Sequence, residues 1–295
     1  LHSEQPAWGP EDILYGLENL HRVSDSNAQI VWPLPHASLV YLPAAKKQHT
    51  AFAVLAAGGA YGAVCTMVEA MPVAARLNAL GFDCFCLNYR TAVPENFVSG
   101  LMPQPLDDLA DALRLIAENR AVFAVDPMQY LLFGFSAGGH LTANYCMFWN
   151  QPWLAESLGT TGAMLKPNAM ILGYPVITSG PFAHEESFRN LLAEEYDSKK
   201  EEFSLESCVN EDTPKAFVWH TFGDHVVPVQ NSLLLVSALV AHGIPVEYHV
   251  FEKGEHGLSL ANRLTSSRPG ADLQPAAEAW MSLLHTWLEV WAQEE

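Results

Sequence analysis

The sequence predicts an α/β fold built on a mostly parallel central sheet with helices on both faces. Short apolar runs, typical of buried strands, alternate along the chain with longer segments that repeat apolar residues at helical spacing. Two of the helical segments end at a glycine, Gly81 and Gly243, as helices commonly do. Buried strands that alternate with helices are the pattern of a parallel sheet covered on both sides.

The expected elements follow one another in a regular order. The apolar runs that predict strands lie at 36–42, 50–59, 82–90, 128–135, 169–177, 215–223 and 246–252. The segments with helical periodicity are 68–81, 105–123, 229–243 and 273–293. The helix over 105–123 carries acidic residues in its first turn, where the helix dipole favours them.

Two stretches depart from this alternation inside what we expect to be a single domain, residues 1–295. Residues 150–166 and 178–212 form an excursion above the sheet, and we expect them to be cap or pocket-wall insertions. The second stretch holds ten acidic residues against three basic ones. A solvated helical face is the alternative interpretation of these acids, and it is the one we favour for the acids themselves.

Composition and charge limit the classes of function. The chain has 15 Lys and Arg against 33 Asp and Glu, a net charge of −18, which disfavours nucleic acid as a partner because phosphate contacts need clustered bases. No apolar run reaches the roughly 18 residues of a membrane helix, so no membrane partner is expected. The start shows no signal-peptide pattern, and the five cysteines form no CxxC. Free thiols in the cytoplasm fit these observations best.

The stretch "GFSAGG" is the first candidate for chemistry. It matches G-x-S-x-G with Gly134, Ser136 and Gly138, between a predicted strand and a predicted helix. Such a sharp turn makes the serine hydroxyl project at the carboxyl edge of a sheet, and crowding requires small residues two positions before and after it. Ser136 is therefore the candidate nucleophile.

A serine nucleophile needs a base, and in this arrangement the order along the chain is serine, acid, histidine. His256 lies in "EKGEHGLSL", a glycine-flanked loop directly after the last predicted strand. His249 and His220 lie inside predicted strands, and His140 lies on the helix after Ser136, so each is expected to pack against its neighbours instead. His256 is the candidate base.

The orienting acid is expected after the penultimate strand. "WHTFGDHVVP" places Asp224 there, and a turn carboxylate at a helix start is the alternative role for this residue. Asp212 is a distant second candidate. The oxyanion needs backbone N–H donors, of which Ala137 supplies one because it follows the nucleophile. The loop "LAAGGAYG" (55–62), after an early strand, is expected to supply the other, because Gly58, Gly59 and Ala60 let the backbone approach a ligand closely.

Together these motifs resemble the α/β-hydrolase superfamily, and within it the acetyl esterase and xylan-esterase-like carboxylesterases related to the hormone-sensitive lipase group. The resemblance covers about residues 50–265 and is carried by "AAGGAYG", "NYR" with "PLDDLADALRLI", "GFSAGGHL", "FVWHTFGDHVVPVQNS" and "VFEKGEHGLSL". The chain departs from the family pattern at Ala57 and Ala60. An alanine at position 60 still donates its N–H, while its methyl group narrows the acyl pocket.

The resemblance implies a role for each matching residue. Ser136 would be the nucleophile, Asp224 the orienting acid and His256 the base. The N–H groups of Gly59, Ala60 and Ala137 would bind the oxyanion. Tyr61 would then border the substrate site, with a core tyrosine as the alternative. Arg90 and Asp108 are expected to form a structural ion pair, and Glu69 fits the pattern without an evident role.

The function expected from the residues and the resemblance is serine carboxylesterase activity on short-chain esters. Acetyl groups on sugars or xylan fragments are the substrates that the resemblance implies, and no metal or organic cofactor is required. A serine peptidase, a formamidase or an inactive binding protein on the same fold are the alternatives. A metalloenzyme is disfavoured because no HExxH or comparable cluster occurs. The amphipathic segment 273–293 leaves a homodimer open.

Overall fold

The computed structural model describes residues 37–92, 100–158, 162–266 and 272–294. Seven strands of the described residues form one sheet in the order β1-β3-β2-β4-β5-β6-β7. The first strand pairs antiparallel with β3 and every other neighbouring pair is parallel. The strands are β1 (Ser38–Leu42), β2 (Phe52–Ala56), β3 (Asp83–Asn88), β4 (Tyr130–Phe135), β5 (Ala169–Gly173), β6 (Lys215–Thr221) and β7 (Val246–Phe251).

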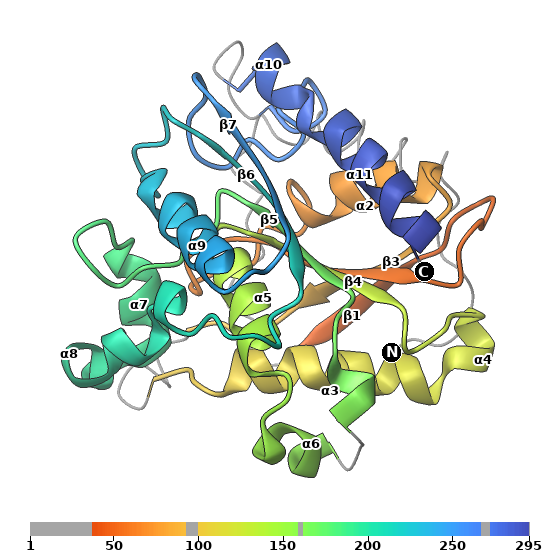
Figure 1. Ribbon diagram of the computed structural model, residues 1–295, viewed down its shortest axis with the longest axis horizontal. Coiled ribbons are helices and arrows are strands. Elements are labelled where there is room, and N and C mark those ends of the chain that lie inside the picture. The colour runs from red at the N-terminus through yellow and green to blue at the C-terminus, as the bar shows by residue number, and fades with distance from the viewer. Residues whose placement is uncertain (1–36, 93–99, 159–161, 267–271, 295) are drawn as a thin grey trace.

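Helices cover both faces of this sheet, as Figure 1 shows. α2 and α11 lie together on one face, while α3, α5 and α9 lie on the other. All residues of the central strands β2, β4 and β5 are buried, as expected for parallel strands packed on both sides. The helices are α2 (Ala70–Ala79), α3 (Gln104–Glu118), α4 (Arg120–Phe123), α5 (Ser136–Phe148), α6 (Pro152–Leu158), α7 (Glu185–Leu192), α8 (Tyr196–Lys199), α9 (Gln230–Ala241), α10 (Pro275–Glu278) and α11 (Trp280–Glu294).

The predicted α/β class is confirmed, and each predicted strand has its counterpart in the sheet. Two predicted helices are divided in the structure. The segment 105–123 is interrupted at Asn119, whose side-chain amide donates a hydrogen bond to the Leu115 carbonyl at 2.9 Å. Asparagine ends helices in this way because its side chain competes for backbone groups. The segment 273–293 is likewise divided, at Ala279.

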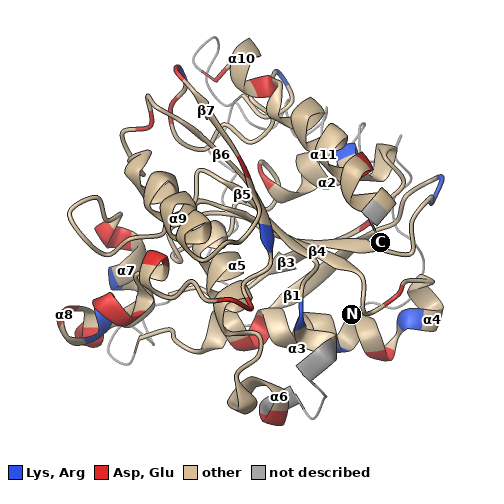
Figure 2. Ribbon diagram, viewed as in Figure 1, with Lys and Arg blue, Asp and Glu red and all other residues tan. Residues whose placement is uncertain are grey.

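The stretch 178–212 lies outside the sheet and contains α7, α8 and three short 3₁₀ helices, Ala193–Glu195, Lys200–Phe203 and Leu205–Ser207. Its acidic residues are mostly exposed, and Figure 2 shows them on the outer side of α7 and α8. The opposite side is apolar, because Phe188, Leu191 and Leu192 are buried. The acids therefore form a solvated face, which is the interpretation that we favoured for them.

Two further expectations concern the interior. Arg90 and Asp108 form the expected ion pair, with 2.7 Å between the guanidinium and the carboxylate, and it joins the end of β3 to α3. The five cysteines are free, and three of them are buried. Within the described ranges, no helix is both long and apolar enough to cross a membrane.

Candidate active site

The turn between β4 and α5 holds Ser136 in a strained position. Its φ of +52° lies in the left-handed region, which is unusual for a residue with a side chain. A Cβ added at Gly134 would lie 2.5 Å from the carbonyl oxygen of Gly138, and one added at Gly138 would meet the carbonyls of Ala56 and Ala57. The small residues of G-x-S-x-G are therefore required by the close approach of three backbone segments, as the motif predicts.

The three predicted triad residues meet at the carboxyl ends of the strands. The Nε2 atom of His256 lies 2.8 Å from the Ser136 hydroxyl, and its Nδ1 lies 2.6 Å from Oδ2 of Asp224. The side chains of Asp224 and His256 are 0% and 16% exposed, so the carboxylate is fully buried while the imidazole is partly accessible to solvent. Nδ1 carries the proton, because the carboxylate can only accept it. Nε2 is then free to accept the proton of Ser136.

Asp224 is held in its ionised form by four hydrogen-bond donors. Its Oδ1 accepts the N–H groups of Val226 and Val227, each at 2.9 Å, and its Oδ2 accepts from His256 and from Nε2 of His220 at 3.2 Å. Burial raises the pKa of this carboxyl, but the hydrogen bonds and charges of His220 and His256 outweigh burial and lower its pKa below the usual range. Asp224 therefore stays charged throughout the neutral range.

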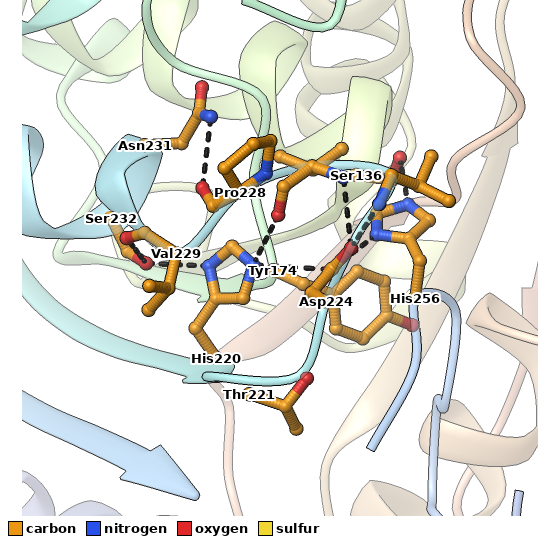
Figure 3. Close-up of polar contacts among 12 residues, drawn as sticks. Ser136, Tyr174, His220, Thr221, Asp224, Pro228, Val229, Asn231, Ser232 and His256 are labelled. Carbon is orange, nitrogen blue, oxygen red and sulfur yellow. Dashed lines mark hydrogen bonds and ion pairs between the residues drawn. The ribbon is translucent and has the colours of Figure 1, made fainter. Parts of the chain in front are cut away.

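His220 is a member of the site that the sequence analysis treated only as a packed strand residue. Its ring is fully buried, and Nε2 also lies 3.0 Å from the Val227 carbonyl. Since both neighbours of Nε2 only accept, this nitrogen carries the proton. Nδ1 lies 2.6 Å from the hydroxyl of Ser232 on α9. Figure 3 shows the resulting chain of hydrogen bonds from Ser232 through His220 and Asp224 to His256 and Ser136.

The other candidates lie elsewhere. Nε2 of His249 lies 2.8 Å from the carboxylate of Glu247 on its own strand. This matches the expectation that His249 packs along the sheet and is not the base. Asp212 is exposed and accepts a hydrogen bond from Asn150 at 2.7 Å, so it does not orient the base. Within the described residues, no group of three or more His, Cys, Asp and Glu side chains could hold a metal ion.

The predicted oxyanion loop passes close to the nucleophile, because a Cβ added at Gly58 would lie 2.7 Å from Cβ of Ser136. Among the described residues, the N–H groups of Gly59 and Ala60 have no hydrogen-bond acceptor, although the Gly59 carbonyl accepts from Gly62 and Ala63. Ala137 is the second residue of α5, where N–H groups lack an intrahelical acceptor. Gly59 and Ala60 both have positive φ, +130° and +54°, so the loop turns its backbone sharply at this point. These three groups remain our prediction for the oxyanion hole.

A second contact to this loop comes from the 178–212 stretch and was not anticipated. The side-chain amide of Asn190, on α7, donates a hydrogen bond to the carbonyl of Ala60 at 2.8 Å. The contact fixes the peptide that follows Ala60 and places α7 directly against the oxyanion loop. Sequence reasoning had no signal for it, because the two residues are 130 positions apart.

Tyr61 is a core residue, which was the alternative to substrate binding in the sequence analysis. Its ring is 2% exposed, and its hydroxyl lies 2.9 Å from Nδ1 of His140. The expectation that Tyr61 binds substrate is therefore not supported by its position, because the side chain points into the core. His140 packs as predicted, with Nε2 2.9 Å from the carbonyl of Phe203. The tyrosine thus connects the oxyanion loop to α5 and to the 178–212 stretch.

His140 gives a prediction for stability against pH. Burial lowers its pKa from 6.5 to about 4, partly opposed by its hydrogen bond to the Phe203 carbonyl. Between pH 6.5 and 4 the unfolded state therefore binds a proton at His140 that the folded state does not. The free energy of unfolding keeps its full value above pH 6.5 and decreases as the pH falls towards 4. The loss amounts to about 3 kcal/mol. Urea midpoints at pH 8, 6 and 5 for wild type and His140→Gln should show a steeper fall in the wild type, and parallel curves would contradict this.

The geometry is accompanied by similarity to known proteins. The model of the family BD-FAE matches residues 39–239. The chain is 36% identical to "Endo-1,4-beta-xylanase B" of Butyrivibrio fibrisolvens over 70% of its own length and 32% of that protein's. It is 27% identical to "Acetylxylan esterase" of Xylanibacter ruminicola, over 69% of its length and 40% of that protein's. The chain thus spans a third to two fifths of these curated relatives.

A solved structure is similar over nearly the whole chain. It is described as the acetyl ester-xyloside bifunctional hydrolase from Caldicellulosiruptor lactoaceticus, with a TM-score of 0.70 and 32% sequence identity. The similarity covers 88% of this chain and 90% of that one. The strand order, the strained turn at Ser136 and the matched family model all indicate the same fold. The chain belongs to the BD-FAE family, among the esterases of the α/β-hydrolase superfamily.

Proposed function

We propose that this protein is a serine carboxylesterase that hydrolyses short-chain acyl esters. The observation that carries the proposal is the continuous contact from Asp224 to His256 to Ser136, at 2.6 and 2.8 Å. Nε2 of His256 takes the Ser136 proton as the hydroxyl oxygen attacks the ester carbonyl, and the negative Asp224 stabilises the imidazolium. The tetrahedral oxyanion is bound by the backbone N–H groups beside the nucleophile.

The second half of the reaction uses the same groups. The imidazolium gives its proton to the departing alcohol oxygen, which leaves an acyl group on Ser136. Water then loses a proton to His256 as it attacks the acyl carbonyl, and collapse of the second oxyanion releases the acid and restores the serine. Every proton is transferred through Nε2 of His256, so the two reaction steps balance without another proton donor or acceptor.

Acetyl groups on xylan fragments are the substrates that we propose. Two of these three similar proteins are named for acetyl ester chemistry, and all three for xylan or xylosides. The loop alanine at position 60 also adds a methyl group next to the predicted oxyanion donors, which favours a short acyl chain. Phe182 is 39% exposed, so it has surface available for stacking on a sugar ring, and core packing does not account for it. Trp153 is 44% exposed but lies on α6, beyond the end of α5 opposite to Ser136 (Figure 1).

The proposal is tested by hydrolysis of p-nitrophenyl acetate, butyrate and octanoate. We expect turnover to fall with chain length, to disappear in Ser136→Ala and to be unaffected by EDTA. Acetylated xylo-oligosaccharides, followed by acetate release, then test the sugar substrate. Turnover of octanoate above acetate would contradict the short acyl chain. A folded wild type with no esterase turnover, but with cleavage of amide substrates, would favour the peptidase or formamidase alternative.

A further inference from the structure

The buried carboxylate of Glu69 is outside the triad yet contacts the catalytic loops. This residue precedes α2 and is 4% exposed. Its Oε2 accepts the N–H of Gly58 at 2.5 Å, and its Oε1 accepts the hydroxyl of Tyr174 at 2.9 Å. We propose that Glu69 is a positioning residue for ester hydrolysis, which fixes the oxyanion loop against Ser136 and, through Tyr174, the loop that carries His256. The inference rests on the proposed function.

The bond to Gly58 acts at the point where the oxyanion loop passes the nucleophile. A Cβ at Gly58 would lie 2.7 Å from Cβ of Ser136, so the two backbones are in contact. The Gly58 N–H is occupied by the carboxylate and is not available to substrate. Its role is therefore to hold the chain in place just before the donors at Gly59 and Ala60.

The bond to Tyr174 extends the same carboxylate to the histidine loop. The Tyr174 hydroxyl donates to Glu69 and accepts the N–H of Ser259 at 3.0 Å, three residues beyond His256. The tyrosine ring packs edge-on against the imidazole of His256, with centroids 5.0 Å apart. Tyr174 has a φ of +37° and Ser259 a φ of +50°, so both backbones are held in conformations that need support. Figure 3 shows Tyr174 beside His256 and Asp224.

The chemistry of this bridge requires an acceptor at both oxygens of Glu69. The Tyr174 hydroxyl donates its one proton to Oε1 of Glu69 and accepts the N–H of Ser259. In Glu69→Gln, an amide nitrogen in the place of Oε1 could not accept that proton, so two donors would face each other. Burial raises the pKa of Glu69 above its usual value, and the Gly58 N–H, the charge of His256 and the Tyr174 hydroxyl only partly oppose this.

Misplacing the donors and the base affects the transition state more than the bound ester. We therefore expect Glu69→Gln to lower kcat for p-nitrophenyl acetate by roughly 10- to 100-fold, since displacements of about 1 Å cost this much, with KM nearly unchanged. Tyr174→Phe keeps the carboxylate but breaks the bridge to Ser259, and should lower kcat less. The double variant should be no slower than Glu69→Gln alone, because both changes break one connection.

Asp83→Asn is a matched control for loss of a buried carboxylate. Asp83 is 2% exposed and, like Glu69, accepts one tyrosine hydroxyl and one backbone N–H, from Tyr41 at 3.0 Å and Ala44 at 2.8 Å. In addition, Oδ2 of Asp83 forms an ion pair with Lys47 at 2.7 Å. It lies at the start of β3, whereas the catalytic residues follow the carboxyl ends of the strands. This variant should lower the urea midpoint and keep kcat. A loss of kcat in Asp83→Asn equal to that in Glu69→Gln would overturn the proposal.

A second measurement separates this inference from the proposed function. The rate at which a fluorophosphonate labels Ser136 depends on the base and the oxyanion donors, and it needs no ester substrate. Slower labelling of both Glu69→Gln and Tyr174→Phe, with wild-type labelling of Asp83→Asn, would support the role of Glu69 even if esters are not the natural substrates. Wild-type kcat and labelling rates in both variants would overturn it, as would a wild type that is not labelled.

Discussion

Replacing Ser136 with alanine is expected to lower kcat for p-nitrophenyl acetate by about 10⁶-fold, because the nucleophile is lost while binding and the oxyanion donors remain. The same loss is expected for His256→Ala, since Nε2 of His256 lies 2.8 Å from the Ser136 hydroxyl and takes its proton. The double variant should be no slower than either single variant, because the two residues act as one unit. Active-site labelling with a fluorophosphonate, read by mass, measures the same loss independently.

The structure offers a control of similar chemistry for this prediction. Ser187 is buried, 1% exposed, and its hydroxyl lies 2.8 Å from Nδ1 of His184. Ser187→Ala therefore also removes a buried hydroxyl next to an imidazole, but on α7 and not at the strained turn that holds Ser136. Its kcat should stay near the wild-type value. An unchanged kcat in Ser136→Ala, with folding confirmed by its thermal midpoint, would exclude the serine mechanism.

The triad could be predicted from the sequence because each member is marked by local features. Ser136 is flanked by glycines after an apolar run, and Asp224 and His256 each follow a recognisable strand. Parallel strands bring their carboxyl ends to one edge, so the order of elements already implies that the three side chains meet. The strand and helix pattern was equally local, and one of its errors, the division at Asn119, lies where a side chain competes with the backbone.

The supporting residues could not be predicted in this way. Glu69 and Tyr174 are 105 positions apart, and neither lies in a motif whose spacing predicts their contact. His220 was judged by its place inside a strand, but its function depends on which side of β6 its ring points to and on what α9 presents there. Tyr61 was expected to border the substrate site, with a core tyrosine as the alternative, and its side chain is buried in the core. Such contacts depend on register and packing.

Replacing Asp224 with asparagine is expected to lower kcat by about 10⁴-fold. The amide oxygen can still accept the N–H groups of Val226 and Val227, so the turn should survive. The amide nitrogen would then take the place of Oδ2, where it faces the protonated Nε2 of His220 and Nδ1 of His256. Its N–H group would favour the tautomer with the proton on Nε2, which cannot accept the proton of Ser136. The imidazolium would also lose its counter-charge.

Asp212→Asn distinguishes this mechanism from a general loss of negative charge. Asp212 was the second candidate for the acid, and the structure places it on the surface beside Asn150. The same chemical change there should leave kcat and the pH profile as in the wild type. If Asp224→Asn instead kept full activity while Asp212→Asn lost it, the assignment of the acid would be wrong. If both kept it, His256 would need no carboxylate, and the contact at 2.6 Å would be structural only.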